Sequence, residues 1–219
     1  MHNQIQLARQ FAAIICENER DLIELPPGAA GQIDVKRCID FGGGGARYGT
    51  NGGYFEAAGL TGGTTFTMSV SGARSTAQQH DYASFRDFSA GNTNDRVTLA
   101  QRVVTGVYTI QMWDDVNSWL TPGSPVNPTT GVWNRVAGVY NGTSRALYID
   151  GVSRATQSGI TARDAGFTAF AIGNDDTTGA ENFDGDIAFA YIRMQAMSAD
   201  WLAAEHSMVS NPGGFYTIT

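Results

Sequence analysis

The sequence predicts an all-β fold: an antiparallel two-sheet sandwich with an N-terminal helical arm and a short C-terminal helix. Three observations support this prediction. About ten short runs rich in β-branched and aromatic residues follow one another after residue 32, without an intervening long helix. The 219 residues include 27 glycines at scattered positions, as is typical of a chain with many tight turns. By contrast, residues 3–24 contain no glycine or proline and space their apolar residues as a helix does.

The N-terminal arm is defined by a stripe of apolar side chains. The stripe consists of Leu7, Phe11, Ile14, Ile15 and Leu22. Pro26-Pro27-Gly28 ends the predicted helix, so residues 1–31 form the arm and its linker and residues 32–219 form the sandwich domain. Two alternatives stay open for the arm. It packs against its own sandwich, or it docks onto a partner subunit or a larger protein assembly.

The strands of the sandwich are expected to be short and joined by tight turns. They are Arg37–Phe41, Gly53–Glu56, Thr64–Val70, Asp81–Phe88, Arg96–Leu99, Gly106–Trp113, Trp133–Asn141, Ala146–Ile149, Phe167–Ile172 and Asp186–Met194. Asn141-Gly142 and Asp150-Gly151 supply the positive φ angles that hairpin turns require. A last helix is expected to start at Ser198, a favourable N-cap, and to run to about His206.

Residues 133–151 carry a recognisable pattern of strand, turn, strand and turn. The stretch begins with Trp133-Asn134-Arg135-Val136-Ala137, reverses at Asn141-Gly142 and ends with Leu147-Tyr148-Ile149-Asp150-Gly151. Val136, Gly138 and Tyr140 share one face of the first strand. This stretch resembles the concanavalin A-like jelly roll, and specifically its laminin-G-like and pentraxin-like branch.

The resemblance extends over roughly residues 33–219. Phe183-Asp184-Gly185-Asp186-Ile187 is similar to the family's closing strand, and Met197-Ser198-Ala199-Asp200-Trp201 is similar to the small helix that follows it. The resemblance implies a jelly roll with Trp133 and Trp201 in its core. It does not imply one function, because this fold hosts lectins, adhesion modules, hydrolases and structural parts.

Charge and cysteine content exclude several classes of protein. The net charge is −7, and Lys36 is the only lysine, so the chain has no basic stripe for nucleic acid or for a membrane surface. No run of about 20 apolar residues predicts a membrane span. Cys16 and Cys38 are too few for a disulfide framework and are expected to be inert buried thiols. The first residues lack the features of a signal peptide. We therefore expect synthesis in the cytoplasm and a place on a virion or assembly surface.

No catalytic residues are predicted. Glucanases on this fold carry Glu-x-Asp-x-Glu on one strand, because their chemistry needs two carboxylates on one face, and this pattern is absent. Asp184-Gly185-Asp186 is the nearest candidate, but it reads better as the entry to a strand. Asp114 and Asp115 are adjacent and would face apart in a strand. His80-Asp81 is expected in a surface loop.

An oxygen-rich segment, residues 173–179, is the candidate metal site. Asn174, Asp175 and Asp176, together with Asp184, offer the oxygen ligands that calcium prefers. Calcium is also the common ion of the family that the sequence resembles. The alternative is an ordinary polar loop without an ion.

Exposed aromatic residues are the candidate glycan-binding groups, because sugar rings stack on them. The candidates are Trp119, Trp113 and Tyr82. Trp119 lies in a stretch, 114–122, that is expected to form a loop. The alternative for this side chain is a loop aromatic that is tucked against the sandwich.

Three hypotheses of function follow. The first is a non-catalytic structural or adhesive module of a virus or phage particle (capsid decoration, fibre or tail protein), with glycans as a ligand class and the arm as its anchor or oligomerisation element. The second is a stand-alone, calcium-assisted lectin. The third is an atypical glycoside hydrolase.

Overall fold

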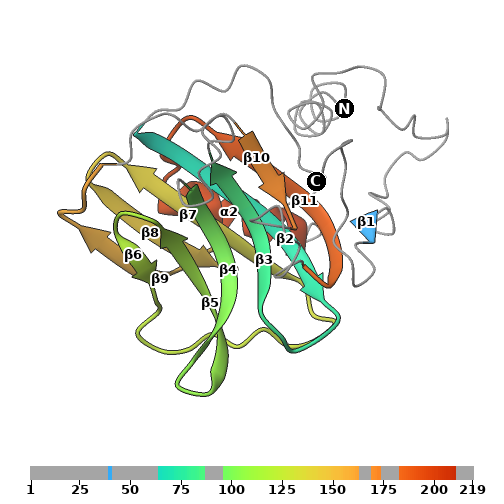
Figure 1. Ribbon diagram of the computed structural model, residues 1–219. Helices are drawn as coiled ribbons and strands as arrows, with labels where there is room; N and C mark the ends of the chain where they lie inside the picture. The colour runs from blue at the N-terminus through green and yellow to red at the C-terminus, as the bar shows by residue number, and fades with distance from the viewer. Residues whose placement is uncertain (1–38, 41–63, 87–95, 163–168, 174–182, 211–219) are drawn as a thin grey trace, which may run out of the picture. The chain divides into compact units, whose positions relative to one another are not determined.

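Two antiparallel sheets form the part of the chain that the computed structural model describes, namely residues 39–40, 64–86, 96–162, 169–173 and 183–210 (Figure 1). The six-stranded sheet has the order β1 (Ile39–Asp40), β11 (Gly185–Arg193), β2 (Thr65–Arg74), β7 (Asn134–Asn141), β8 (Ser144–Ile149) and β9 (Val152–Ser158). The five-stranded sheet has the order β10 (Ala169–Ile172), β3 (His80–Arg86), β4 (Arg96–Val104), β5 (Val107–Asp114) and β6 (Ser118–Leu120). One helix, α2 (Ala199–Ser210), follows β11.

The chain crosses between the sheets repeatedly. It passes from β2 to β3, from β6 to β7, and from β9 by way of β10 to β11. Strands distant in sequence therefore become neighbours, as β2 does with β7 and β11. This is the predicted two-sheet jelly roll, and it confirms the expected fold class.

The core fills the space between the sheets. On β7, Val136 and Tyr140 point inward, as the alternating pattern predicts. The Tyr140 ring stacks on Phe66 at a centroid distance of 4.9 Å. Gly138 lies between Val136 and Tyr140 on β7. A Cβ at this position would be 2.9 Å from Leu99 Cδ2 of the opposite sheet. Glycine therefore allows the two sheets to approach closely at this point.

Helix α2 packs on the outer face of the six-stranded sheet. Leu202 contacts Ala137 and Val139, the outward residues of β7. Beneath the helix, the Glu205 carboxylate is 2.8 Å from an Arg135 nitrogen and accepts a hydrogen bond of 2.8 Å from the Tyr191 hydroxyl. Burial, with the Glu205 carboxylate next in importance, raises the pKa of Tyr191 above its ordinary value. This side of the sandwich is thus occupied by the chain itself.

Several expectations about the elements need correction. Trp133 and Trp201 are not core residues, because they are 36% and 37% exposed. The last helix continues four residues beyond His206, to Ser210. Two strands were not expected, β6 and β9, and β9 pairs with β8 through a bulge at Arg154. None of the described helices is long and apolar enough to cross a membrane.

Other expectations fall outside the described residues. They include the helical arm and linker, residues 1–31, with the stripe of Leu7, Phe11, Ile14, Ile15 and Leu22. They also include the expected strand Gly53–Glu56. These stay predictions.

Candidate functional site

Two tryptophans lie side by side on the outer face of the five-stranded sheet. Trp113 on β5 and Trp119 on β6 are direct cross-strand partners. Their neighbours Met112 and Leu120 point into the core, so alternation turns both indoles outward. The ring centroids are 6.2 Å apart, and Trp119 is 38% exposed. The structure thus brings together two of the three predicted glycan-binding residues, and it places Trp119 in a strand and not in a loop.

Each tryptophan ring has an arginine of β4 over its face. The guanidinium carbon of Arg96 is 5.1 Å from the centroid of Trp113, and that of Arg102 is 5.5 Å from the centroid of Trp119. Such cation–π contacts contribute about 0.5–1 kcal/mol each at exposed sites. The arginines therefore restrict the orientation of the two rings.

Arg102 is also held by contacts with the neighbouring strand β3 and with its own strand. Its NH2 group is 2.6 Å from Asp81 Oδ1, and its NH1 group donates hydrogen bonds of 3.0 Å to the carbonyls of His80 and Gln101. The Asp81 side chain is fully buried and that of Arg102 is 12% exposed. The guanidinium charge beside Trp119 is thus compensated by a carboxylate from the neighbouring strand β3.

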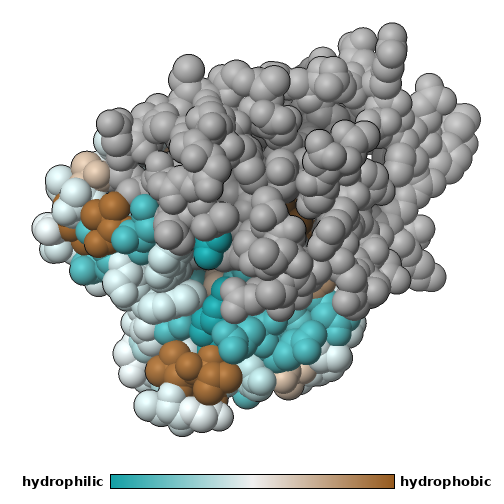
Figure 2. Space-filling model, in the orientation of Figure 1, coloured by the Kyte–Doolittle hydropathy of each residue, from teal (hydrophilic) through white to brown (hydrophobic). Residues whose placement is uncertain are grey.

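A shallow groove of about 500 Å³ opens beside Trp119. Its lining residues are Gln79, Arg102, Val103, Val104, Gln111, Trp119 and Thr121. Across the groove floor, Gln111 Nε2 donates a hydrogen bond to Thr121 Oγ1. At the tip of the β4–β5 hairpin, Figure 2 shows a hydrophobic patch bordered by hydrophilic surface, and Val103 and Val107 are the exposed apolar residues of this hairpin. The groove therefore combines aromatic, aliphatic and amide groups.

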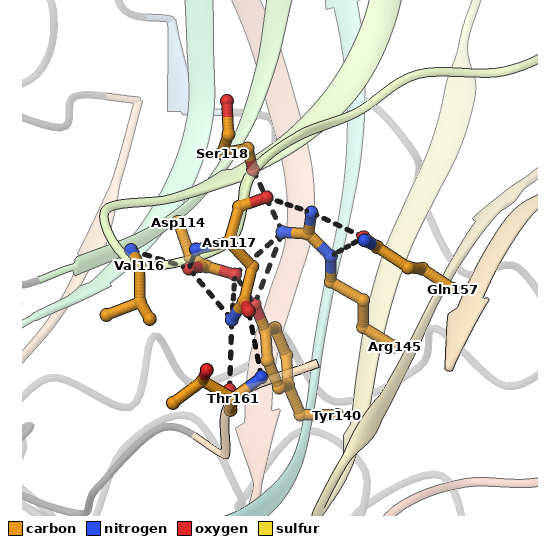
Figure 3. A network of polar contacts seen from close by, with 8 residues as sticks. All are labelled: Asp114, Val116, Asn117, Ser118, Tyr140, Arg145, Gln157 and Thr161. Carbon is orange, nitrogen blue, oxygen red and sulfur yellow. Dashed lines mark hydrogen bonds and ion pairs between the residues drawn. The ribbon is translucent and has the colours of Figure 1, made fainter. Parts of the chain in front are cut away.

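A buried ion pair fixes the turn that carries Trp119 (Figure 3). Arg145 of β8 reaches across from the other sheet, and its NH1 group is 2.6 Å from Asp114 Oδ2. The same guanidinium donates to the carbonyls of Asn117 and Ser118, at 2.9 and 3.0 Å. Asp114 accepts hydrogen bonds from the Asn117 backbone amide and from the Tyr140 hydroxyl. Both members of the pair are fully buried, so the β5–β6 turn is tied to the opposite sheet.

None of the residues of this network lines the groove beside Trp119. Asp114 points inward, and Asp115, the first residue of the β5–β6 turn, is exposed. Burial, with the Asp114 carboxylate next in importance, raises the pKa of Tyr140 well above its ordinary value. The network thus positions Trp119 through the turn and is a structural support of the candidate site.

Tyr82 is not part of this face. It is 1% exposed, and its ring packs on Phe183 at a centroid distance of 4.8 Å. The physical reason is a bulge in the β3–β4 pairing between Asp81 and Ala83, which lets both Tyr82 and Ala83 point into the core. Burial raises the pKa of the Tyr82 hydroxyl above its ordinary value. A buried ring cannot stack on a sugar, so this predicted site residue is wrong.

The expected surface loop at His80-Asp81 is also wrong. Both residues are fully buried at the start of β3. His80 Nε2 is 3.0 Å from the Thr76 carbonyl, and Nδ1 accepts a hydrogen bond of 3.2 Å from the Asp184 backbone amide. The ring is thus held at both nitrogens by backbone groups of two distant segments.

The candidate calcium ligands are only partly described. Asn174, Asp175 and Asp176 lie outside the described residues. The Asp184 carboxylate accepts a hydrogen bond of 2.8 Å from the Thr76 hydroxyl, and Gly185 next to it has a φ of +146° at the entry to β11. Among the described residues, no group of three or more His, Cys, Asp or Glu side chains is arranged to hold a metal ion.

Sequence reasoning did not identify four residues around the tryptophans. They are Arg102, Gln111, Thr121 and Arg145. Alternation along β5 could have placed Gln111 on the face of Trp113, two residues away. The other three depend on contacts between distant segments, which the local sequence does not reveal.

Comparisons with known proteins agree with this fold. Residues 47–203 match the family model of the concanavalin A-like lectin/glucanases superfamily. A search by sequence among curated proteins gave no match. Among solved structures, a native heptameric SAP-like pentraxin from Limulus polyphemus aligns with a TM-score of 0.55 and 14% identity, over 74% of this chain and 80% of that one.

Two further structures are similar. The CBM40 of the Ruminococcus gnavus IT-sialidase, bound to α2,3-sialyllactose, aligns with a TM-score of 0.57 and 17% identity, over 74% of this chain and 96% of that one. The enzymatically active domain of tailspike protein 2 from bacteriophage CBA120 aligns with a TM-score of 0.51 and 16% identity, over 70% of this chain and 25% of that one. At these identities the likeness concerns the fold. Because the family model spans most of its length, the chain belongs to the concanavalin A-like lectin/glucanases superfamily.

Proposed function

We propose that this chain is a non-catalytic adhesive module that binds glycans at the groove beside Trp119. The observation that carries the proposal is the outward, arginine-braced tryptophan pair at the edge of an open groove. A sugar ring buries its C–H face on an indole, while a few polar groups orient its hydroxyls. Trp119 offers the indole, and Gln111 and Thr121 offer the polar groups.

The groove's composition supports a binding role over hydrolysis. Glycosidases flank the scissile bond with two carboxyl groups, about 5 to 9.5 Å apart. None of the described residues that line the groove is an acid. Asp81 forms an ion pair with Arg102, and its side chain is fully buried. A bound sugar would therefore meet amide, hydroxyl and apolar groups on this face.

A place on a virus or phage particle is part of the proposal. The fold is compatible with it, because the bacteriophage CBA120 tailspike contains a domain that aligns with this chain. We expect residues 1–31 to anchor or oligomerise the module. Native mass measurement of the full chain and of a chain starting at Gln32 tests this part. A multimeric full chain and a monomeric, folded truncation are expected, and two species of equal oligomeric state would contradict an oligomerising arm.

Glycan binding is tested by a saccharide array, with and without calcium, followed by titration calorimetry. Trp119→Ala is expected to weaken binding at least tenfold. Trp201→Ala is the matched control, because Trp201 is similarly exposed and has Arg193 over its ring at 5.5 Å, but lies on α2. An equal loss in both variants, or no saccharide bound by the unaltered chain, would contradict the proposed site.

A further inference from the structure

The groove beside Trp119 carries no uncompensated charge among its described lining residues. Arg102 is the one ionisable side chain in this lining. Asp81 Oδ1 is 2.6 Å from its NH2 group, and the Asp81 side chain is fully buried. The negative charge of Asp81 therefore offsets the positive charge of Arg102. Arg96, which also belongs to β4, lies over Trp113 and does not line the groove.

Three N–H groups of Arg102 donate hydrogen bonds within the fold. Its NH1 group donates to two backbone carbonyls, of His80 and Gln101, and its NH2 group donates to Asp81. Recognition of a carboxylate by arginine is strongest when two parallel N–H groups face the ligand. A carboxylate that approached Arg102 would also meet the Asp81 carboxylate, whose Oδ1 is 2.6 Å from the NH2 group, and this like charge weakens the attraction.

The other groups of the groove suit an uncharged sugar. Gln111 Nε2 donates to Thr121 Oγ1, so the Thr121 hydroxyl keeps its own proton to donate and the Gln111 carbonyl oxygen keeps its capacity to accept. These groups match neighbouring sugar hydroxyls. Val103 and Val104 extend the apolar surface of the Trp119 indole. A hexopyranose presents just such a combination, with C–H groups on one face and hydroxyls at its rim.

We propose that the groove selects neutral hexopyranose units and discriminates against sugars that bear a carboxylate. This inference rests on the proposed function and specifies its ligand class. Arg102 then acts as a positioning residue, which holds the Trp119 ring, and not as an anion receptor. The site would thus differ in ligand class from the Ruminococcus gnavus CBM40 bound to sialyllactose, although the two share a fold.

The test compares neutral sugars with related sugars that carry a carboxylate. Neutral gluco- and galacto-oligosaccharides are titrated beside their uronic acid counterparts, and lactose beside α2,3-sialyllactose. The neutral member of each pair is expected to bind at least tenfold more tightly. The affinity for the neutral member is expected to change less than twofold between low and high salt. A neutral sugar has no charge–charge attraction to the groove that salt could screen. Tighter binding of the acidic members, or a steep loss with salt, would overturn the inference and leave glycan binding standing. Failure of every saccharide to bind would overturn the proposed function and, with it, this ligand class.

A variant tests the role of the buried carboxylate directly. Asp81→Asn keeps the size of the side chain but removes the charge that compensates Arg102. The ratio of acidic to neutral affinity is expected to rise about tenfold in this variant. An unchanged ratio in a folded variant would contradict the claim that Asp81 sets the preference. Circular dichroism establishes folding, and if the variant does not fold, the salt dependence of the unaltered chain decides the question.

Discussion

Replacing Arg145 by methionine is expected to destabilise the fold and to loosen the turn that carries Trp119. Arg145 and Asp114 are both fully buried and 2.6 Å apart. Removing one partner of a buried pair costs about 3–5 kcal/mol, because the other charge stays desolvated. Asp114 keeps its hydrogen bonds from the Asn117 amide and the Tyr140 hydroxyl. We therefore expect a loss near the lower limit, about 3 kcal/mol, which corresponds to a fall in Tm of about 10 °C for a chain of this size.

The measurement is urea unfolding followed by tryptophan fluorescence. Arg154→Met on β9 is the matched control, because Arg154 is exposed and its loss is expected to change the free energy of unfolding by about 0.5 kcal/mol or less. A double variant, Asp114→Asn with Arg145→Met, no longer buries a lone charge. It is expected to recover at least about 1 kcal/mol relative to the sum of the single variants. A loss under about 1 kcal/mol for Arg145→Met, or strict additivity in the double variant, would refute the reasoning.

Three other perturbations test the remaining parts of the structure. Gly151 has a φ of +75°, and a Cβ there would be 3.0 Å from the Ala203 Cα of helix α2, whereas Gly106 has a φ of +81° and open space around it. Gly151→Ala is therefore expected to lower the free energy of unfolding by at least about 1 kcal/mol more than Gly106→Ala does. Urea unfolding measures both values. Equal losses would argue against a close approach of the turn to the helix. Glu205→Gln removes the carboxylate that pairs with the buried Arg135 and is expected to lower the free energy of unfolding by about 3 kcal/mol. It is also expected to speed amide hydrogen exchange in α2, and unchanged exchange would contradict this docking contact. Burial raises the pKa of three tyrosines above the unfolded value of about 10, so the folded state binds these protons more tightly. Their contribution to the free energy of unfolding is therefore complete below pH 10 and decreases as the pH rises above 10. The three tyrosines are Tyr82, Tyr140 and Tyr191. Tm measured from pH 8 to pH 11.5, with tyrosinate absorbance, checks this trend, and a Tm that is flat above pH 10 would speak against it.

The sequence was sufficient to predict those strands in which apolar and polar residues alternate, so that one face is buried. The β7 pattern predicted correctly that Val136 and Tyr140 point inward, because a period of two leaves one register for a strand with a single core face. Strand β9 was missed because it is a polar edge strand with little burial on either face, so hydrophobicity gives no signal. Strand β6 was missed because three residues after an Asp- and Asn-containing turn look like a loop.

The candidate site was predictable only in part. Trp113 and Trp119 could be chosen by residue type, but their pairing depends on β6, which the sequence did not suggest. Tyr82 was chosen by the same criterion and failed, since a bulge changed the side to which it points. The burial of Arg145 was not predictable either, because its partner Asp114 lies 31 residues earlier in the chain. Residue type thus nominates candidates, and pairing between distant segments decides among them.

The bulge at Arg154 has a consequence for molecules held at high density. Strand β9 ends the six-stranded sheet, and among the described strands it pairs with β8 alone, so its outer edge carries backbone groups that a flat neighbouring strand could use. The bulge interrupts the regular spacing of those groups, and the exposed arginine places a positive charge on the strand. Two copies that meet at this edge would bring their Arg154 charges toward each other. The irregular backbone and the like charges thus oppose a continuous sheet between two copies.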